Sequence, residues 1–352
     1  MGYKLNEKLE SMQAYKPIEG DYRVRLDANE SFILPDSKLK AAIRKRLESL
    51  AFNRYPDPLA GELCDLAARY YGSEPENITA GNGSDELISI IVSAFLSKGD
   101  TLLTFSHDFS MYAFYAHVFE ARLLQMSKRE DLTIDFEKAA ELCKNENVKM
   151  VIFSNPCNPT SLGAGKDEIL KFIKEVPSLV VVDEAYMDFM GQSLLEHINE
   201  FDNLIILRTM SKAMGMAGLR LGFAVARQEF SQALKKAKSP YNVNAVSQAI
   251  ACEIFSRPLY IENSINKIIA SRDSLLKEFK RLEKDTSGKL KVVGGQANFV
   301  FAKAEKAADL FEYLKAGGLI IRLFDPYIRV TAGRNSENSE VITSIEEFYT
   351  GR

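Results

Sequence analysis

The sequence predicts an α/β protein, with a large, mostly parallel sheet covered by helices on both faces and a smaller α+β lobe. The first observation is a series of short, nearly continuous apolar runs between residues 78 and 225, which alternate with helical segments. Such runs are typical of parallel strands buried on both faces. The second is a change after Ser239-Pro240, where long helical periodicity precedes mixed strands and helices. The third is the length of 352 residues, which exceeds one ordinary core and predicts two lobes.

The composition is that of an ordinary globular protein, with 46% apolar and 26% charged residues. A net charge of −3 gives no indication of a nucleic-acid or membrane partner. The cysteines are scattered without a CxxC pair or clustered histidines, so neither a metal site nor a disulfide framework is predicted. The first residues lack the apolar core of a signal peptide, and no stretch of about 18 apolar residues occurs. A reducing cytoplasm is the expected location.

The first quarter of the chain is mostly helical in pattern. Val24 to Glu30 is a short alternating run, and Asp36 to Leu50 has the periodicity of an amphipathic helix. The segment 53–58 contains two prolines and breaks this helix, because proline disfavours helical conformations in the residue before it. Gly61 to Tyr71 is helical again.

The strands of the predicted sheet begin at Ile78, which leads into the glycine turn Gly81 to Glu86 and the apolar helix Leu87 to Leu96. The other strand-type runs are Thr101 to Phe105, Lys149 to Phe153, Ser178 to Val182, Leu204 to Leu207 and Leu221 to Val225. Several of these runs end at polar residues. Because neighbouring ends of parallel strands converge at one edge of a sheet, these residues are expected to face one pocket.

The last hundred residues predict the smaller lobe. Ile261 to Lys284 has the longest helical stripe, and helical patterns recur at Glu305 to Leu314 and Ser336 to Phe348. Leu290 to Ala302 and Gly318 to Phe324 have the pattern of strands. Part of the first 45 residues is expected to complete this lobe.

A lysine-containing loop follows the strand-type run Leu204 to Leu207. The loop contains Ser211 and Lys212 and continues past glycines to Arg220. A lysine at a strand end can form a Schiff base with an aldehyde, and the rigid fork of an arginine can hold a phosphate. Pyridoxal phosphate carries both groups. The alternative is a surface lysine in a Gly-rich loop.

Four further side chains at strand ends suit the ring of the same cofactor. Asp183 would pair with the pyridine nitrogen and keep it protonated. Tyr186 and Asn158 would donate hydrogen bonds to the phenolate oxygen of the ring. Phe109 offers an aromatic face on which the ring could stack. Together these side chains predict a pocket that surrounds the ring.

The phosphate of the cofactor has candidate donors as well. The backbone N–H groups of Gly83, Ser84 and Asp85 open a helix and form an anion site, to which Ser211 and Arg220 add donors. Each feature has a structural alternative, namely a helix cap, a turn or an ordinary connection. Their joint occurrence at strand ends, with a lysine and an arginine, favours the cofactor site.

With these residues in place, the chain resembles the fold-type I pyridoxal-phosphate aminotransferases, and within them the histidinol-phosphate aminotransferase family. The likeness runs from Leu26 to Thr331. The segments that carry it are Arg54-Tyr55-Pro56-Asp57, Gly83-Ser84-Asp85-Glu86, Asn155 to Thr160, Asp183-Glu184-Ala185-Tyr186, Ser211 to Gly222 and Pro240-Tyr241-Asn242-Val243-Asn244. The resemblance implies a seven-stranded large sheet. It also implies three parts: an N-terminal arm with part of the small domain (1–45), a large pyridoxal-phosphate domain (46–250) and a small C-terminal domain (251–352).

The same resemblance implies a ping-pong transfer of an amino group between L-histidinol phosphate and 2-oxoglutarate, a step of histidine biosynthesis. Lys212 would hold the cofactor aldehyde and then move the substrate α-proton as base and acid. Asp183 and Tyr186 complete the implied catalytic set, and Thr209 joins the implied cofactor-binding set.

The substrate contacts and the assembly are implied in the same way. Arg322 and Arg329 would grip the far anionic group of each substrate, because an arginine fork fits both phosphate and carboxylate. Tyr15 and Asn29 would close the pocket from the N-terminal arm. Tyr55 would reach the cofactor phosphate in the partner subunit, so a homodimer with shared active sites is expected.

Three departures from the family pattern loosen the substrate assignment. Ser161 follows Asn-Pro-Thr where the family usually has glycine, and Phe109 stands in place of the usual tyrosine after Ser106-His107-Asp108. The linker between Arg322 and Arg329 is short. The alternatives are an aromatic amino acid aminotransferase, a phosphothreonine decarboxylase of the same fold, and a regulatory protein that only binds the cofactor.

Overall fold

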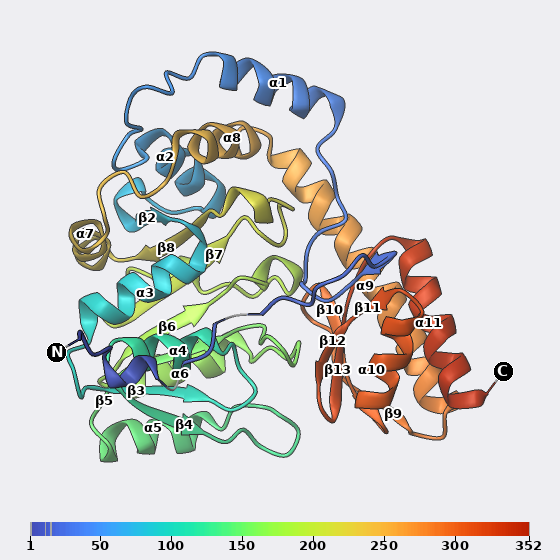
Figure 1. Cartoon of the computed structure of the whole chain (residues 1–352). Helices are drawn as coiled ribbons and strands as arrows, with labels where there is room; N and C mark the ends of the chain where they lie inside the picture. The colour runs from blue at the N-terminus through green and yellow to red at the C-terminus, as the bar shows by residue number, and fades with distance from the viewer. Residues whose placement is uncertain (1, 11, 15, 352) are drawn as a thin grey trace.

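The computed structural model describes residues 2–10, 12–14 and 16–351, and its centre is a seven-stranded sheet of order β2-β8-β7-β6-β5-β3-β4 (Figure 1). The strands are β2 (Ile78–Gly81), β3 (Thr101–Phe105), β4 (Arg122–Met126), β5 (Val148–Ser154), β6 (Leu179–Asp183), β7 (Leu204–Thr209) and β8 (Gly222–Ala226). Only β8 runs antiparallel to its neighbours in this sheet; the other adjacent pairs are parallel. The predicted large, mostly parallel sheet is confirmed.

Helices cover both faces of the sheet because successive side chains of a strand point to opposite sides. In β6, Val180 and Val182 belong to one apolar core, whereas Val181 belongs to the core on the other face. The helices that pack on the first face are α1 (Ser37–Glu48), α2 (Gly61–Tyr71), α5 (Phe136–Asn145), α6 (Lys166–Glu175) and α8 (Ala245–Phe255). Those on the second face are α3 (Gly83–Phe95), α4 (Met111–Val118) and α7 (Gln228–Ala237). Burial on both faces explains the uninterrupted apolar runs.

Several elements differ from the sequence-based expectation, and among them strand β13 (Tyr327–Thr331) of the small lobe was not predicted. The edge strand β4 was not predicted, because its residues 122–125 are exposed or only half-buried and lack the apolar run of a central strand. Helix α3 begins at Gly83, four residues earlier than its apolar run, since the glycine turn forms the first turn of the helix. This earlier start places the helix N-terminus directly at the end of β2.

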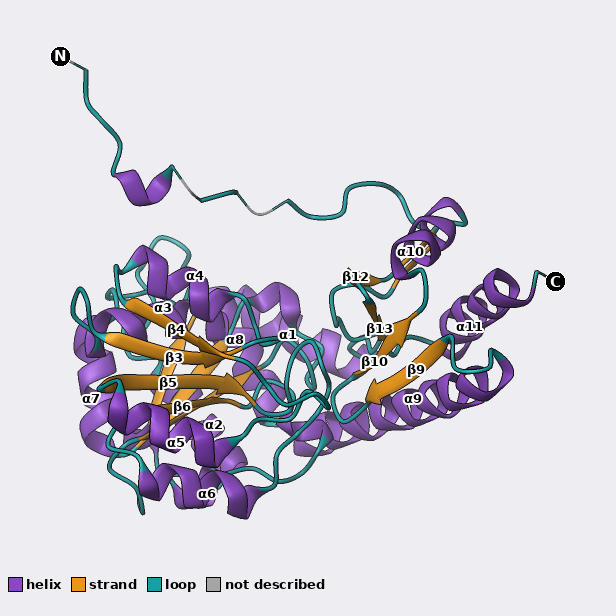
Figure 2. Cartoon of the chain, turned by 90° about the horizontal axis from the view of Figure 1, so that it is seen from below, coloured by secondary structure: helices purple, strands orange, loops and turns teal. Residues whose placement is uncertain are grey.

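The small lobe is an antiparallel sheet packed against helices (Figure 2). Its sheet has the order β12-β13-β10-β9, and β1 pairs with β11 in a separate parallel ribbon. The strands are β1 (Val24–Arg25), β9 (Leu290–Gly294), β10 (Phe299–Ala304), β11 (Leu319–Ile320), β12 (Arg322–Phe324) and β13 (Tyr327–Thr331). The helices are α9 (Pro258–Asp285), α10 (Ala307–Ala316) and α11 (Asn335–Thr350). The predicted smaller α+β lobe is confirmed.

Helix α9 joins the two lobes (Figure 1). Ile261 near its start packs in the large core, whereas Leu275 and Phe279 pack in the core of the small lobe. From the N-terminal part, Val24 belongs to the small-lobe core and Leu39 to the large core. The two cores support the division into lobes, and the exact boundaries at residues 45 and 250 stay a prediction. In the part of the chain that the structure describes, no helix is long and apolar enough to span a membrane.

Candidate active site

Most of the predicted site residues follow the carboxyl ends of β5, β6 and β7. The carboxyl ends of β5 and β6 face the small lobe (Figure 2). The register of the sheet brings the phosphate-binding candidates together. Gly81 of β2 and Thr209 of β7 both pair with Gly222 of β8, so the start of α3 lies beside the Lys212 loop. This is the edge at which open α/β sheets bind their ligands.

The phosphate end of the site has no room for extra side chains. A Cβ on Gly222 would lie 2.7 Å from the backbone N of Ser84, and one on Gly83 would lie 3.0 Å from the Arg220 guanidinium. Gly83 also has φ of +78°, which glycine adopts without strain. The N-terminus of α3 and the arginine therefore converge on one point, as an anion cradle requires.

The hydroxyl groups of the Lys212 loop lie at the same end. Thr209 Oγ1 donates to Ser211 Oγ over 3.1 Å, and the backbone N–H of Ser211 donates to Thr209 Oγ1. Arg220 is in the left-handed backbone region and forms a 3.0 Å ion pair with Asp85. The structure thus brings Thr209, Ser211, Arg220 and the start of α3 together, as predicted for phosphate ligands.

Asp183 lies at the end of β6 and is 3% exposed. It accepts hydrogen bonds from the Tyr112 hydroxyl over 2.9 Å and from the backbone N–H of Ala185 over 3.1 Å. Burial raises the pKa of Asp183 to about 7, and the two hydrogen bonds oppose this shift. A protonated ring nitrogen placed beside this buried carboxylate would form a strong, charge-assisted hydrogen bond with it.

Lys212 is half-buried on the loop after β7, and its Nζ donates to the carbonyl of Ala28 over 3.2 Å. The same Nζ lies 5.7 Å from the centre of the Tyr186 ring. Asn29 donates from Nδ2 to the Tyr186 hydroxyl over 2.9 Å and bonds to Thr331 of the small lobe. The N-terminal segment therefore lies beside Lys212 and Tyr186, where the resemblance placed Asn29.

Arg329 is the buried cation of the site, at 6% exposure. Its guanidinium donates to Asn158 Oδ1 and to the carbonyl of Asp27, and it packs over the rings of Phe299 and Phe324. Because Asn158 Oδ1 accepts from Arg329, the amide NH₂ of Asn158 is the end left to donate to a ligand. Arg329 is therefore not an ordinary exposed arginine on a strand.

Arg322 is half-buried and pairs in register with Arg329 across β12 and β13. Directly opposed residues of an antiparallel pair have neighbouring side chains on one face. Phe109 follows β3 and packs edge-on against the Tyr112 ring, with the ring centres 5.6 Å apart. Its stacking on a cofactor ring stays a prediction.

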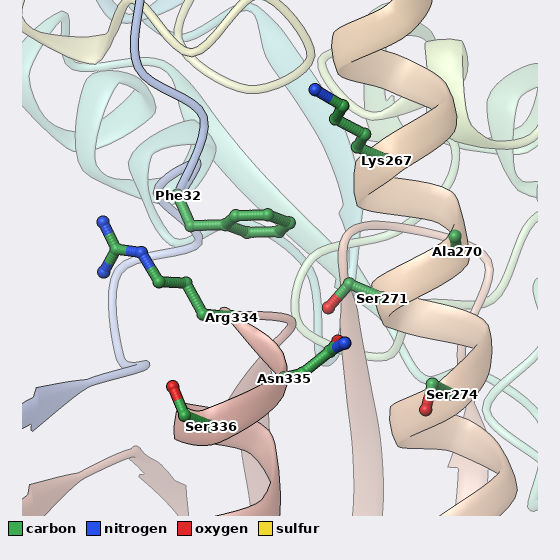
Figure 3. A pocket seen from close by; sticks show the side chains of 8 residues that line it. All are labelled: Phe32, Lys267, Ala270, Ser271, Ser274, Arg334, Asn335 and Ser336. Atoms are coloured by element: carbon green, nitrogen blue, oxygen red, sulfur yellow. The ribbon is translucent and has the colours of Figure 1, made fainter.

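One predicted residue, Tyr55, does not join the site within one chain. Tyr55 is 81% exposed and stacks on Tyr241, with ring centres 4.6 Å apart. Tyr15 lies outside the described residues. A separate open cavity of about 570 Å³, between Phe32, α9 and the start of α11, contains none of the predicted site residues (Figure 3).

Sequence reasoning missed Tyr112, which is fully buried and donates to Asp183. It also missed Thr331, which bonds to Asn29, and Asn298, which donates to the carbonyl of Asn29 over 3.1 Å. No local pattern marks these residues. Tyr112 lies among apolar residues of α4 and has the appearance of an ordinary core aromatic.

Known proteins with similar sequences are aminotransferases. The family "Aminotransferase class I and II" matches residues 22–345. Histidinol-phosphate aminotransferase of Clostridium novyi (strain NT) is 42% identical over 330 residues, which cover 92% of this chain and 91% of that protein.

Among solved structures, histidinol-phosphate aminotransferase from Sinorhizobium meliloti in complex with pyridoxal-5'-phosphate has a TM-score of 0.87 at 24% identity, covering 100% of this chain and 99% of that chain. L-threonine-O-3-phosphate decarboxylase from Porphyromonas gingivalis has a TM-score of 0.79 at 24% identity, covering 92% and 99%. Likeness at this level of identity shows the shared fold.

The fold and the site define a pyridoxal-phosphate-dependent aminotransferase. The chain belongs to the class I and II aminotransferases and, within them, to the histidinol-phosphate aminotransferase family. Its residues fit the cofactor: a helix N-terminus with Arg220 for the phosphate, buried Asp183 for the ring nitrogen, and Lys212 for the aldehyde.

Proposed function

We propose that this aminotransferase moves an amino group between L-histidinol phosphate and 2-oxoglutarate, as a step of histidine biosynthesis. The observation that carries the proposal is the buried Arg329 beside Asn158, with Arg322 in register next to it. Arginine side chains offer fork-shaped donors, which suit either a phosphate or a carboxylate at the far end of a substrate. The Clostridium relative, at 42% identity, supports the same donor.

When bound, pyridoxal phosphate supplies the aldehyde that receives the amino group and a ring that withdraws electrons. We assign the remaining work to the residues of the chain. Lys212 Nζ takes the proton from the substrate α-carbon and returns it elsewhere, as base and then acid. Asp183 holds a proton on the ring nitrogen, and Tyr186 and Asn158 donate to the ring oxygen. The phosphate contacts of Arg220 keep the ring in place during both half-reactions.

The donor is tested by single-turnover absorption spectra of the purified protein with L-histidinol phosphate, phenylalanine or phosphothreonine. We expect L-histidinol phosphate to convert the bound cofactor to pyridoxamine phosphate fastest. Faster conversion with phenylalanine would instead assign an aromatic amino acid aminotransferase. Release of carbon dioxide from phosphothreonine would assign a decarboxylase, which the fold alone also allows.

Arg329→Ala is expected to weaken both L-histidinol phosphate and 2-oxoglutarate, because we assign one anion site to both half-reactions. A lost charge-assisted hydrogen bond costs roughly 1.5–3 kcal/mol, so each KM should rise about ten- to a hundredfold. Arg322→Ala, at the half-buried neighbouring position, is the comparison variant and should have the smaller effect. A change confined to one of the two substrates would contradict the shared site.

We further propose a two-fold homodimer in which Tyr55 of the partner subunit contacts the cofactor phosphate. Tyr55 and Tyr241 are exposed, and they belong to a set of large apolar side chains that a single chain leaves in water. Leu34, Phe52, Leu59 and Leu259 are other exposed members of this set. A self-complementary contact would cover them.

The cytoplasmic location also stays a proposal, and the four buried, unpaired cysteines agree with a reducing compartment.

Mixing two impaired variants tests this dimer. Lys212→Ala and Tyr55→Ala should each lower activity, the first far more than the second. In a mixed dimer, one pocket takes Lys212 from the Tyr55 variant and Tyr55 from the Lys212 variant, so it is native. Co-refolding should therefore raise activity per Lys212-bearing chain above that of the Tyr55 variant alone. No gain under conditions that exchange subunits would show that Tyr55 acts within its own chain or not at all.

A further inference from the structure

A buried polar cluster contacts Phe109 and Asn158, two residues predicted to bind the cofactor ring, and none of the assigned chemistry uses the cluster. The cluster consists of Asp108, Lys128, Ser154 and Cys157, from the loops after β3 and β4, the end of β5 and the loop that follows it. The side chains of Asp108 and Lys128 are 1% and 2% exposed, with Oδ2 and Nζ 3.7 Å apart. A charged pair removed from water in this way requires hydrogen bonds on both sides.

The Asp108 carboxylate holds two chain segments at once. It accepts from the backbone N–H of Phe109 over 2.8 Å, and from both the hydroxyl and the backbone N–H of Ser154. Phe109 is the residue whose ring is predicted to stack on the face of the cofactor. The carboxylate thus fixes the backbone of that residue against the end of β5.

Ser154 connects Asp108 to Asn158. Its Oγ accepts from the backbone N–H of Asn158 over 3.1 Å, and its backbone pairs in register with Asp183 of β6. Asn158 is the residue assigned to the phenolate oxygen of the ring. One carboxylate and one hydroxyl therefore link the residue at the ring face, Phe109, to the residue at the ring edge.

Lys128 is the cation of the cluster. Its Nζ donates to the carbonyl of His107 and to Cys157 Sγ, over 3.1 Å in each case. Burial raises the pKa of Asp108, and the Lys128 ammonium opposes that shift. A buried ion pair of this kind adds little net stability compared with an apolar set of equal volume, so a geometric role accounts better for its place beside the ring.

We propose that Asp108 is a positioning residue for the cofactor ring: through its backbone contact with Phe109 and its Ser154 bridge to Asn158, it sets the orientation in which the ring is held. The proposal rests on the cofactor contacts assigned above to Phe109 and Asn158. It requires the hydrogen-bond acceptor at position 108 rather than the charge. Variants that keep a hydrogen-bond acceptor at position 108 should therefore hold the ring as the parent does, even where their stability is lower.

The variants Asp108→Ala, Asp108→Asn and Lys128→Met test this separation. Alanine removes the acceptor and the charge, asparagine keeps an acceptor without the charge, and Lys128→Met keeps the carboxylate but removes its partner. Three measurements apply to each variant: the Kd of pyridoxal phosphate for the cofactor-free protein, the visible circular dichroism per bound cofactor, and the unfolding temperature of the cofactor-free protein.

We expect Asp108→Ala alone to raise the Kd about tenfold, equivalent to one lost hydrogen bond of the stronger kind, and to change the ellipticity per bound cofactor. Asp108→Asn and Lys128→Met should keep the parent ellipticity although both lower the unfolding temperature. If ellipticity and Kd instead follow the unfolding temperature across all three variants, the cluster is only structural and the positioning role is wrong.

Ser154→Ala provides a second route if Asp108→Ala does not fold, because it removes the bridge to Asn158 and leaves the charge pair in place. It should change the ellipticity as Asp108→Ala does, and an unchanged signal would overturn the proposal. Phe109→Ala and Asn158→Ala distinguish a failure of the assigned ring contacts from a failure of the positioning role. If neither of them alters the cofactor signal, the assigned ring contacts fail; if both do while the Asp108 and Ser154 variants do not, only the positioning role fails.

Discussion

Lys212→Ala is expected to give a folded protein that still binds pyridoxal phosphate but has lost turnover by about 10⁴-fold, the upper range for a positioned acid–base group. The side chain is half-buried and its Nζ donates to the Ala28 carbonyl, so its removal leaves the two cores intact. The phosphate contacts come from the start of α3, Ser211 and Arg220, which the substitution does not touch. Steady-state rates, bound cofactor after dialysis and the unfolding temperature measure the three parts of this result.

Lys267→Ala is the matched control, since Lys267 is an exposed lysine of α9 that lines the separate cavity (Figure 3). Its kinetics should equal those of the parent. Multiple turnovers by the Lys212 variant at more than a few per cent of the parent rate would remove Lys212 from the catalytic set.

Asp183→Asn is expected to keep the fold and lose roughly a hundred- to a thousandfold in activity. Asp183 Oδ1 accepts from the Ala185 N–H and Oδ2 accepts from Tyr112, so the amide oxygen can keep the first hydrogen bond while the amide NH₂ donates to the Tyr112 hydroxyl oxygen. An amide cannot hold a proton on the ring nitrogen, however, and breaking a buried charge pair costs about 3–5 kcal/mol, part of which should appear in cofactor affinity. Activity within twofold of the parent would show that Asp183 is a structural cap.

The same substitution should have the opposite effect on the stability of the cofactor-free protein. Burial raises the pKa of Asp183 from 3.8 to about 7, so the folded state retains this proton after the unfolded chain has lost it. The free energy of unfolding therefore falls as pH rises from about 4 to about 7, by up to about 4 kcal/mol for this one group. Asp183→Asn should flatten that slope and raise the unfolding temperature at pH 8. An unchanged slope between the two proteins would contradict the assigned pKa.

The phosphate end of the site could be predicted from local sequence patterns, whereas the substrate end could not. Lys212, Asp183 and the glycine turn at Gly83 each follow a strand-type run, so their convergence could be predicted from the rule that parallel strand ends meet at one edge. Arg329 had no such signal. As one arginine on a small-lobe strand, it is distinguished by its burial and by its contact with Asn158, which lies 171 positions earlier.

The amino-acid sequence by itself determined the layers of the fold and the residue types at the strand ends, because apolar periodicity and turn chemistry are local properties. It did not determine the order β2-β8-β7-β6-β5-β3-β4, the edge strand β4 or the side-chain pairs between distant segments. Tyr112 meets Asp183 and Asp108 meets Ser154 only because strands and helices far apart in the chain pack together. Such pairs depend on sheet order and loop path, which the tertiary structure alone decides.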